Sequence, residues 1–165
     1  MSDADHPVGD GPRYADELTT GIVWEIGDFL LPRLERAART HPSDSEEGIT
    51  ASALAESVET LVLTLEWAIT GGTPARARVP IGIPPPPKPT EEERRVRAER
   101  RLERLREDWN HLCALAGHWR SAPGFQCSRW RKLDFRDAAH ERWYQQQLSY
   151  RHLPSRVIRP VPPSW

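Results

Sequence analysis

Histidine and cysteine, the side chains that most often bind zinc together, gather in the second half of the chain. The six are His111, Cys113, His118, Cys127, His140 and His152. Structural zinc sites favour pairs of ligands about two to four residues apart, whereas the spacing here would point neighbouring members to different sides of a continuous helix. Only a helix that ends at Gly117 would let Cys113, His118, Cys127 and His140 converge. We therefore predict no metal site and no cofactor, and keep a small zinc-binding protein as a third hypothesis.

Sequence motifs that would support catalysis are missing. The chain has no glycine-rich phosphate loop, no nucleophile elbow and no pair of histidines one helical turn apart with a glutamate between them. Among the carboxylates, only Glu66 lies within an apolar run, beside Trp67. A carboxylate at the edge of an apolar helix face is a simpler interpretation than a desolvated general acid. We therefore expect a protein that is not an enzyme and that has no small-molecule substrate.

Basic and aromatic residues alternate near the C-terminus, as they do in many proteins that bind nucleic acids. Residues 120–165 contain 9 basic and 3 acidic side chains, interleaved with aromatic side chains that could stack on unpaired bases. The candidate nucleic-acid contacts are Arg129, Arg131, Lys132, Arg136 and Arg142. The alternative is that the aromatic side chains form a small core and the arginines its solvated rim. The sequence leaves both interpretations open.

The charge of the chain is divided between its halves. Residues 1–70 contain 4 basic and 14 acidic side chains, and residues 71–165 contain 19 basic and 10 acidic ones, although the net charge of the whole chain is only −1. One interpretation is that acidic helices dock on basic helices within the chain. Because exposed ion pairs contribute about 0–1 kcal/mol each, such docking also needs apolar surfaces to meet. The other interpretation is that the basic half faces an external partner.

Proline divides the chain into the segments that must position these side chains. The 165 residues include 16 prolines, about twice the average share of 5%, and most of them fall into two clusters. The predicted segments are a disordered lead-in, an acidic helical pair, a proline-rich linker, a basic helical unit and an extended proline-rich tail: 1–12, 13–72, 73–89, 90–152 and 153–165. The expected fold class is all-α, either a helical bundle or two helical hairpin-like units joined by the linker.

Two helices are predicted in the acidic half. Apolar residues recur every three or four positions over residues 13–39, and Pro32 should kink or split that helix. A second helix is expected to begin at Thr50, whose hydroxyl can accept a backbone N–H while Ile49 packs on the first turns as a hydrophobic staple. The Gly71–Gly72 pair should end this helix, because glycine readily adopts the left-handed conformation.

A longer helix is predicted to begin after the linker. Thr90 and Glu93 have the spacing of a capping box, in which each side chain accepts a hydrogen bond from the backbone N–H of the other residue. Apolar residues then recur at alternating spacings of four and three, a heptad pattern that needs a partner helix. The predicted helix-contact residues are Leu102, Leu105, Trp109, Leu112 and Trp119. They could pack inside an antiparallel bundle of this chain or against another copy of it.

Glycine and proline delimit the elements in the rest of the basic half. Gly117 should end the long helix, and residues 120–132 are predicted to form a loop because they contain Pro123 and Gly124. Residues 133–137 resemble a capped helix start, and a shorter helix with a patchy apolar side is expected to follow, to about Tyr150. The prolines that follow it are incompatible with a helical tail.

The sequence also indicates where the protein acts. Its acidic N-terminus contains no apolar run of the secretory kind, and the most apolar window, 61–69, is half as long as a membrane span requires. We therefore expect a cytoplasmic protein in which Cys113 and Cys127 are reduced. The sequence favours a non-enzymatic helical adaptor or assembly protein that binds a protein partner or itself. A nucleic-acid-associated protein is the alternative hypothesis.

Overall fold

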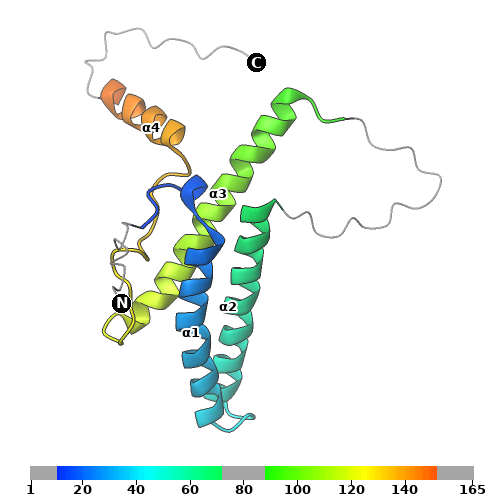
Figure 1. The fold of residues 1–165 in the computed structure, drawn as a ribbon, viewed down its shortest axis with the longest axis vertical. Coiled ribbons are helices and arrows are strands. Elements are labelled where there is room, and N and C mark those ends of the chain that lie inside the picture. The colour runs from blue at the N-terminus through cyan, green and yellow to red at the C-terminus, as the bar shows by residue number, and fades with distance from the viewer. Residues whose placement is uncertain (1–10, 72–87, 152–165) are drawn as a thin grey trace, which may run out of the picture.

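The computed structural model describes residues 11–71 and 88–151, and the chain is all-α within those ranges. Its elements, where η marks a 3-10 helix, are η1 (Ala15–Glu17), α1 (Thr20–Thr40), α2 (Glu46–Thr70), α3 (Glu91–Ala116), η2 (Gly117–Trp119) and α4 (Ala138–Arg151). Figure 1 shows their arrangement. Most of the predicted lead-in and linker, and the whole of the predicted tail, lie outside the described residues.

The first helix begins at Thr20, not at residue 13. The hydroxyl of Thr19 caps it by accepting the backbone N–H of Ile22 at 3.4 Å. The preceding residues are held differently, because the backbone of Tyr14 forms an isolated β-bridge with Phe135. Pairing with a segment more than a hundred residues away therefore prevents the helix from starting earlier.

Pro32 lies inside α1 without splitting it, contrary to one of the two predicted outcomes. The proline is exposed, so the carbonyl group that loses its helical hydrogen bond can be hydrated. Phe29, Leu30 and Leu34, in the turns before and after the proline, are buried in the core. Their packing holds the turns before and after the proline in one line.

The second helix begins earlier than predicted, because its N-cap is Ser45 and not Thr50. The Ser45 hydroxyl accepts the Gly48 N–H at 3.1 Å and donates to the Pro42 carbonyl at 2.7 Å. The predicted staple is also wrong, since Ile49 is exposed. At the other end the prediction is confirmed, with Gly71 as a left-handed C-cap at φ 71°.

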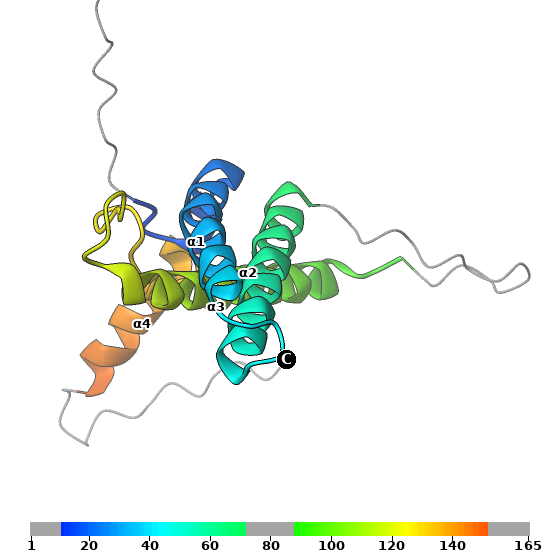
Figure 2. The ribbon, with the colours of Figure 1, turned by 90° about the horizontal axis from the view of Figure 1, so that it is seen from below.

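The first two helices form an antiparallel hairpin, and α3 crosses both of them (Figures 1 and 2). Close approach within the hairpin depends on Gly27, which is buried where α1 meets Val62 of α2. A methyl group at Gly27 would lie 3.1 Å from a Val62 methyl carbon. The absence of a side chain there allows the two backbones to come together.

The third helix has the boundaries that its sequence predicts. Thr90 and Glu93 form the capping box, with the Glu93 N–H donating to the Thr90 hydroxyl at 3.1 Å and the Thr90 N–H donating to the Glu93 carboxylate at 2.9 Å. The α-helix ends before Gly117, where the chain tightens into η2. These ends are fixed by residues within one turn, which is why local sequence suffices to predict them.

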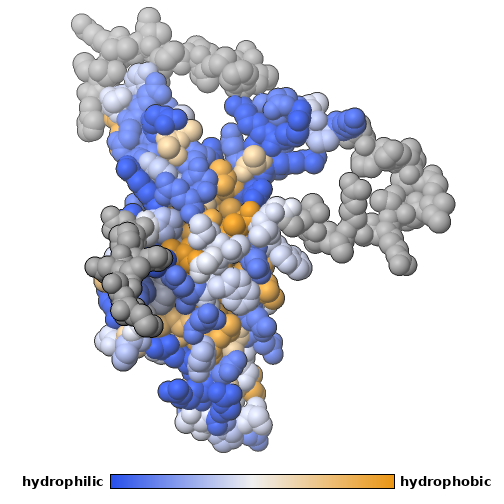
Figure 3. Space-filling model, viewed as in Figure 1, coloured by the Kyte–Doolittle hydropathy of each residue, from blue (hydrophilic) through white to orange (hydrophobic). Residues whose placement is uncertain are grey.

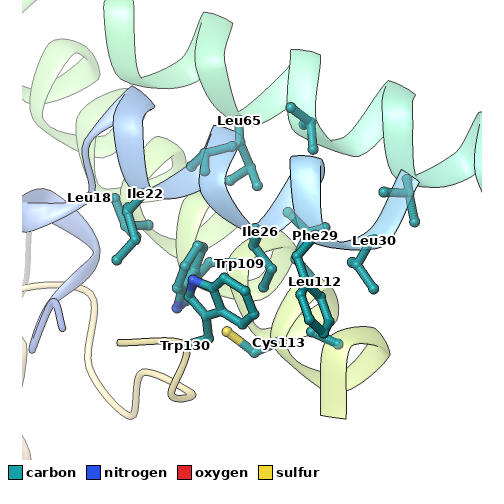
Figure 4. Packing of buried hydrophobic residues seen from close by; sticks show 14 of the residues in the cluster. Leu18, Ile22, Ile26, Phe29, Leu30, Leu65, Trp109, Leu112, Cys113 and Trp130 are labelled. Atoms are coloured by element: carbon teal, nitrogen blue, oxygen red, sulfur yellow. The ribbon is translucent and has the colours of Figure 1, made fainter. Parts of the chain in front are cut away.

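The predicted helix-contact residues of α3 lie in the core of this chain. Leu105, Trp109 and Leu112 are buried, while Leu102 and Trp119 are half-buried against the same cluster. The cluster combines them with buried side chains of α1 and α2, including Ile26 and Leu65 (Figure 4). The acidic and basic halves therefore share one hydrophobic core, and the α3 face that needed a partner finds it within the chain.

The loop after η2 folds back onto α3 and is fastened by Asn110. Its side-chain amide donates to the Leu133 carbonyl at 2.9 Å, and its side-chain oxygen accepts the Leu133 N–H at 2.7 Å. The indole N–H of Trp109 donates to the neighbouring Arg131 carbonyl at 2.9 Å. Leu133 is buried and its backbone is bonded to α3, so this end of the loop is held against the core and the last helix begins only after it, as the capped start predicted within 133–137 implies.

The last helix begins at Ala138 and lies apart from the three-helix body (Figures 1 and 2). Asp137 caps its first turn by accepting the His140 N–H at 2.7 Å. A carboxylate of this helix ties it to the N-terminal segment: Glu141 accepts hydrogen bonds from the Tyr14 hydroxyl and, at 2.9 Å, from the Arg13 guanidinium. Polar contacts to residues before α1 thus fix the position of α4.

The Tyr14–Glu141 contact should respond to pH. The hydrogen bond from Tyr14 lowers the pKa of Glu141 below its ordinary value, and Arg13 lowers it further. Because the folded-state pKa lies below the unfolded one, the contact stabilises the fold fully above the ordinary glutamate pKa, and this stabilisation is lost as the pH falls through the folded-state pKa. Tyr14→Phe should raise the Glu141 pKa in an NMR titration of its carboxyl carbon. Tyr144→Phe, at an exposed ring on the same helix, should leave that pKa unchanged.

Candidate interaction surface

The histidines and cysteines singled out in the sequence are dispersed in the structure. Cys113 is buried and its thiol points to the Arg131 carbonyl at 3.6 Å, whereas Cys127 is exposed. His118 is exposed beside Trp119, and His140 lies on α4, where its ring accepts the Arg136 N–H at 3.5 Å. Within residues 11–71 and 88–151, no three His, Cys, Asp or Glu side chains are close enough to hold a metal ion. His152 lies outside the described residues.

The two thiols should differ sharply in reactivity. Burial raises the pKa of Cys113 to about 12, and only the thiolate attacks an alkylating agent at an appreciable rate. Iodoacetamide at pH 8 should therefore modify exposed Cys127 and leave Cys113 intact until the protein is denatured. Peptide mass spectrometry measures this, with Cys127→Ser as the control that should take up no label when folded. Equal labelling of both native thiols would contradict the packing around α3.

Most of the basic residues predicted to contact nucleic acid are engaged inside the chain. Arg129 pairs with Glu25 of α1 at 3.0 Å, and Arg136 pairs with Glu99 of α3 at 3.4 Å. Arg131 donates to the carbonyl groups of Gly11 and Pro12 at 3.3 and 3.4 Å. Arg129 and Arg136 thus fasten the loop before α4 to helices, and Arg131 fastens it to the N-terminal segment. The other two candidates, Lys132 and Arg142, are exposed.

An open groove with a volume of about 650 Å³ lies between α2 and α3. Its apolar members are Ala53 and Leu61, and hydroxyl and charged groups surround them. The lining residues are Ala53, Glu56, Ser57, Thr60, Leu61 and Thr64 of α2 with Arg104, Asp108 and His111 of α3. The hydroxyls of Ser57 and Thr64 donate to carbonyl groups of their own helix at 2.7 Å. Their donor capacity is therefore used within α2.

The charged side of the groove belongs mainly to α3. Arg104, Asp108 and His111 are spaced four and three residues apart and so share one face of the helix. Partial burial raises the pKa of Asp108, while the charge of Arg104 acts in the opposite direction. No nucleophile paired with a base occurs among these lining residues. The groove presents apolar, hydroxyl and charged groups side by side along two helices.

Next to the groove, the outer side of α2 exposes large apolar side chains. Ile49, Leu63 and Trp67 form what we call the α2 crest, and Trp67 is 55% exposed. The helix is 25 residues long and is the one helix in the described parts of the chain that is long and apolar enough to cross a membrane. Its inner side is nevertheless part of the core, where Val58 and Val62 are completely buried.

No family model, curated protein or solved structure matches this chain. Its apolar crest and adjacent groove are features that sequence periodicity did not predict, because α2 carries apolar residues outside its core face as well and the pattern does not reveal which of them the other helices cover.

The charges beside the groove are separated by helix. α2 contains five glutamates and no lysine or arginine, and none of the five has an ion-pair partner among the described side chains. Four of them, Glu46, Glu47, Glu56 and Glu59, are exposed. The outer surface of α2 thus combines uncompensated negative charge with the apolar crest.

The opposite charge lies on the first half of α3. Arg97, Arg100, Arg101 and Arg104, here called the arginine row, are exposed and make no ion pair with any described carboxylate. Their spacing of three, one and three residues places them along one side of the helix. Figure 3 shows strongly hydrophilic side chains over this end of the molecule, at its upper right. The spacing of these four arginines at three, one and three residues is visible in the sequence and is the signal that predicts the row.

Proposed function

We propose that this chain is a non-enzymatic helical adaptor or assembly protein that receives a helix of a protein partner in the groove between α2 and α3. The observation that supports this proposal most directly is the groove, which is lined by residues of both helices. Its α2 side runs from Ala53 to Thr64, about three helical turns or roughly 16 Å. Helix-binding grooves of this kind recognise apolar anchors at intervals of three or four residues.

The surroundings of the groove support a protein partner. Exposed tryptophan is the side chain most often found at the energetic centre of protein interfaces, and Trp67 lies on the adjoining crest. The mixture of carboxylates, arginine and histidine at the groove suits a peptide surface better than a uniformly negative phosphate backbone. A cytoplasmic location remains part of the proposal.

The proposal can be tested by photocrosslinking in the cell that produces the protein. A photoreactive amino acid at Thr60 in the groove should form a covalent adduct with another polypeptide after irradiation. The same amino acid at Arg36, exposed on α1, serves as the matched control and should form none. Absence of an adduct from position 60, or identical adducts from both positions, would refute the use of the groove.

A further inference from the structure

The arginine row and the acidic outer surface of α2 are complementary but are not paired with each other within one chain. Arg94, Arg95 and Arg106 bind the glutamates three residues before them, at 2.5 to 2.9 Å. The arginine row has no such neighbours among the described residues. Arg97, Arg100 and Arg101 make no ion pair with the described side chains. Arg104 is partly balanced by nearby Asp108, and the like-charge repulsion within the row costs energy. An interaction with an acidic surface outside the chain would remove that cost.

The two surfaces adjoin at the C-terminal end of α2. Arg101 donates to the Ile69 carbonyl at 3.1 Å, where a cation is favoured by the negative end of the helix dipole. Arg104 lines the groove together with Glu56 of α2. The first turns of α3 continue beyond the end of α2 (Figure 1), and the contacts of Arg101 and Arg104 place the C-terminal part of the arginine row beside α2.

Two such surfaces on one chain can bind a second copy of that chain. In a dimer with two-fold symmetry, the same patch is used by both subunits, and each residue on one subunit meets a different residue on the other. A patch with both a basic row and an acidic, apolar surface meets this condition. In the symmetric dimer, the basic row of each subunit contacts the acidic surface of the other, which makes two identical contacts. A patch of a single charge would repel its own copy.

We propose that the partner of this surface is a second copy of the chain, with the arginine row of each subunit lying on the acidic outer surface of α2 of the other. This inference rests on the proposed function, since it names the protein that docks beside the groove. Trp67 lies at the centre of the contact and supplies its apolar anchor. The Leu105 and Trp109 face takes no part, because it is buried in the core.

The test uses charge reversal in the purified full-length chain. Arg97→Glu/Arg100→Glu and Glu56→Arg/Glu59→Arg should each weaken the dimer by about 100-fold or more, because like charges then face each other at an interface. Arg36→Glu/Arg39→Glu, at exposed positions of α1, is the control and should leave dimerisation unchanged. Sedimentation equilibrium gives the dissociation constant, and circular dichroism establishes that each variant is folded.

Mixing the two interface variants provides the decisive arm. In a mixed dimer, the reversed, acidic row of the first variant lies on the reversed, basic α2 of the second. At the other contact, the native basic row of the second variant lies on the native acidic α2 of the first. Opposite charges therefore meet at both contacts, and the mixed dimer should form with near wild-type affinity. A wild-type monomer at all concentrations, or failure of the mixture to associate, would overturn the proposal. If Arg97→Glu/Arg100→Glu weakened binding to DNA or RNA without changing the solution mass of the protein, the proposed dimer would be refuted and nucleic acid would be the partner of the arginine row.

The crosslinking experiment separates this inference from the proposed function. An adduct at position 60 with twice the mass of the chain supports both proposals. An adduct with a different protein, together with a monomeric purified chain, supports the adaptor function and refutes self-association. No adduct at all refutes the function itself.

Discussion

Trp109→Ala is expected to lower the free energy of unfolding by about 3–5 kcal/mol, the range measured for removing a buried aromatic ring. The Trp109 side chain of α3 is fully buried in the hydrophobic core (Figure 4). The same change removes the donor that binds the Arg131 carbonyl at 2.9 Å. Since whole domains are stable by only about 5–15 kcal/mol, the variant should be partly unfolded at physiological temperature.

Urea denaturation followed by circular dichroism measures this effect. Trp143→Ala is the matched control, because Trp143 is 56% exposed on α4 and its loss should change stability by only about 0.5 kcal/mol. Trp109→Phe should fall between the two, since it keeps most of the apolar volume but loses the indole N–H. Equal stabilities for the Trp109 and Trp143 variants would contradict the assignment of the core.

Leu105→Glu should unfold the protein, and it is the sharpest test of what the heptad pattern means. Leu105 is 2% exposed, so the new carboxylate would be buried without a partner in addition to the loss of apolar contacts. Losing the leucine costs about 2–5 kcal/mol, and an uncompensated buried charge adds roughly 3–5 kcal/mol. The sum is comparable to the entire stability of a domain of this size.

Ala98→Glu provides the comparison for Leu105→Glu. Both residues belong to the same apolar register of α3, but Ala98, one heptad before Leu105, is exposed. Its replacement should alter the free energy of unfolding by no more than about 0.5 kcal/mol. The helicity and the urea midpoint of each variant show whether the Leu105 face is part of the internal core, in which case only Leu105→Glu lowers both. A folded Leu105→Glu variant that differs from wild type only in oligomeric state would show that this face binds another chain.

The charge separation seen in the sequence has two consequences in the structure. Part of it is internal, as in the pairs that Arg129 makes with Glu25 and Arg136 makes with Glu99. These ion pairs are partly exposed, so each contributes about 0–1 kcal/mol to stability. Burial of the shared apolar core is therefore the main interaction that joins the two halves. The glutamates of α2 and the arginine row make no ion pair among the described side chains, and these are the charges on which the proposed self-association depends.

Sequence reasoning succeeded where residues within one or two turns decide the outcome. The capping box at Thr90 and Glu93, the end of α3 at Gly117 and the left-handed Gly71 were all predicted correctly. It failed where distant segments compete with local preferences. Tyr14 is held by a β-bridge to Phe135, so the residues before Thr20 do not form the helix that their local sequence favours.

The sequence by itself determined the all-α class, the apolar face of α3 and the segregation of charge, because helical periodicity and capping depend on neighbours within about four residues. Only the tertiary structure decided which faces become covered. It placed Leu105 and Trp109 against α1 and α2, engaged Arg131 and Arg136 inside the chain, and left Trp67 exposed beside a groove. Burial is a property of pairs of helices, and a periodic pattern on one helix does not specify the surface that meets it.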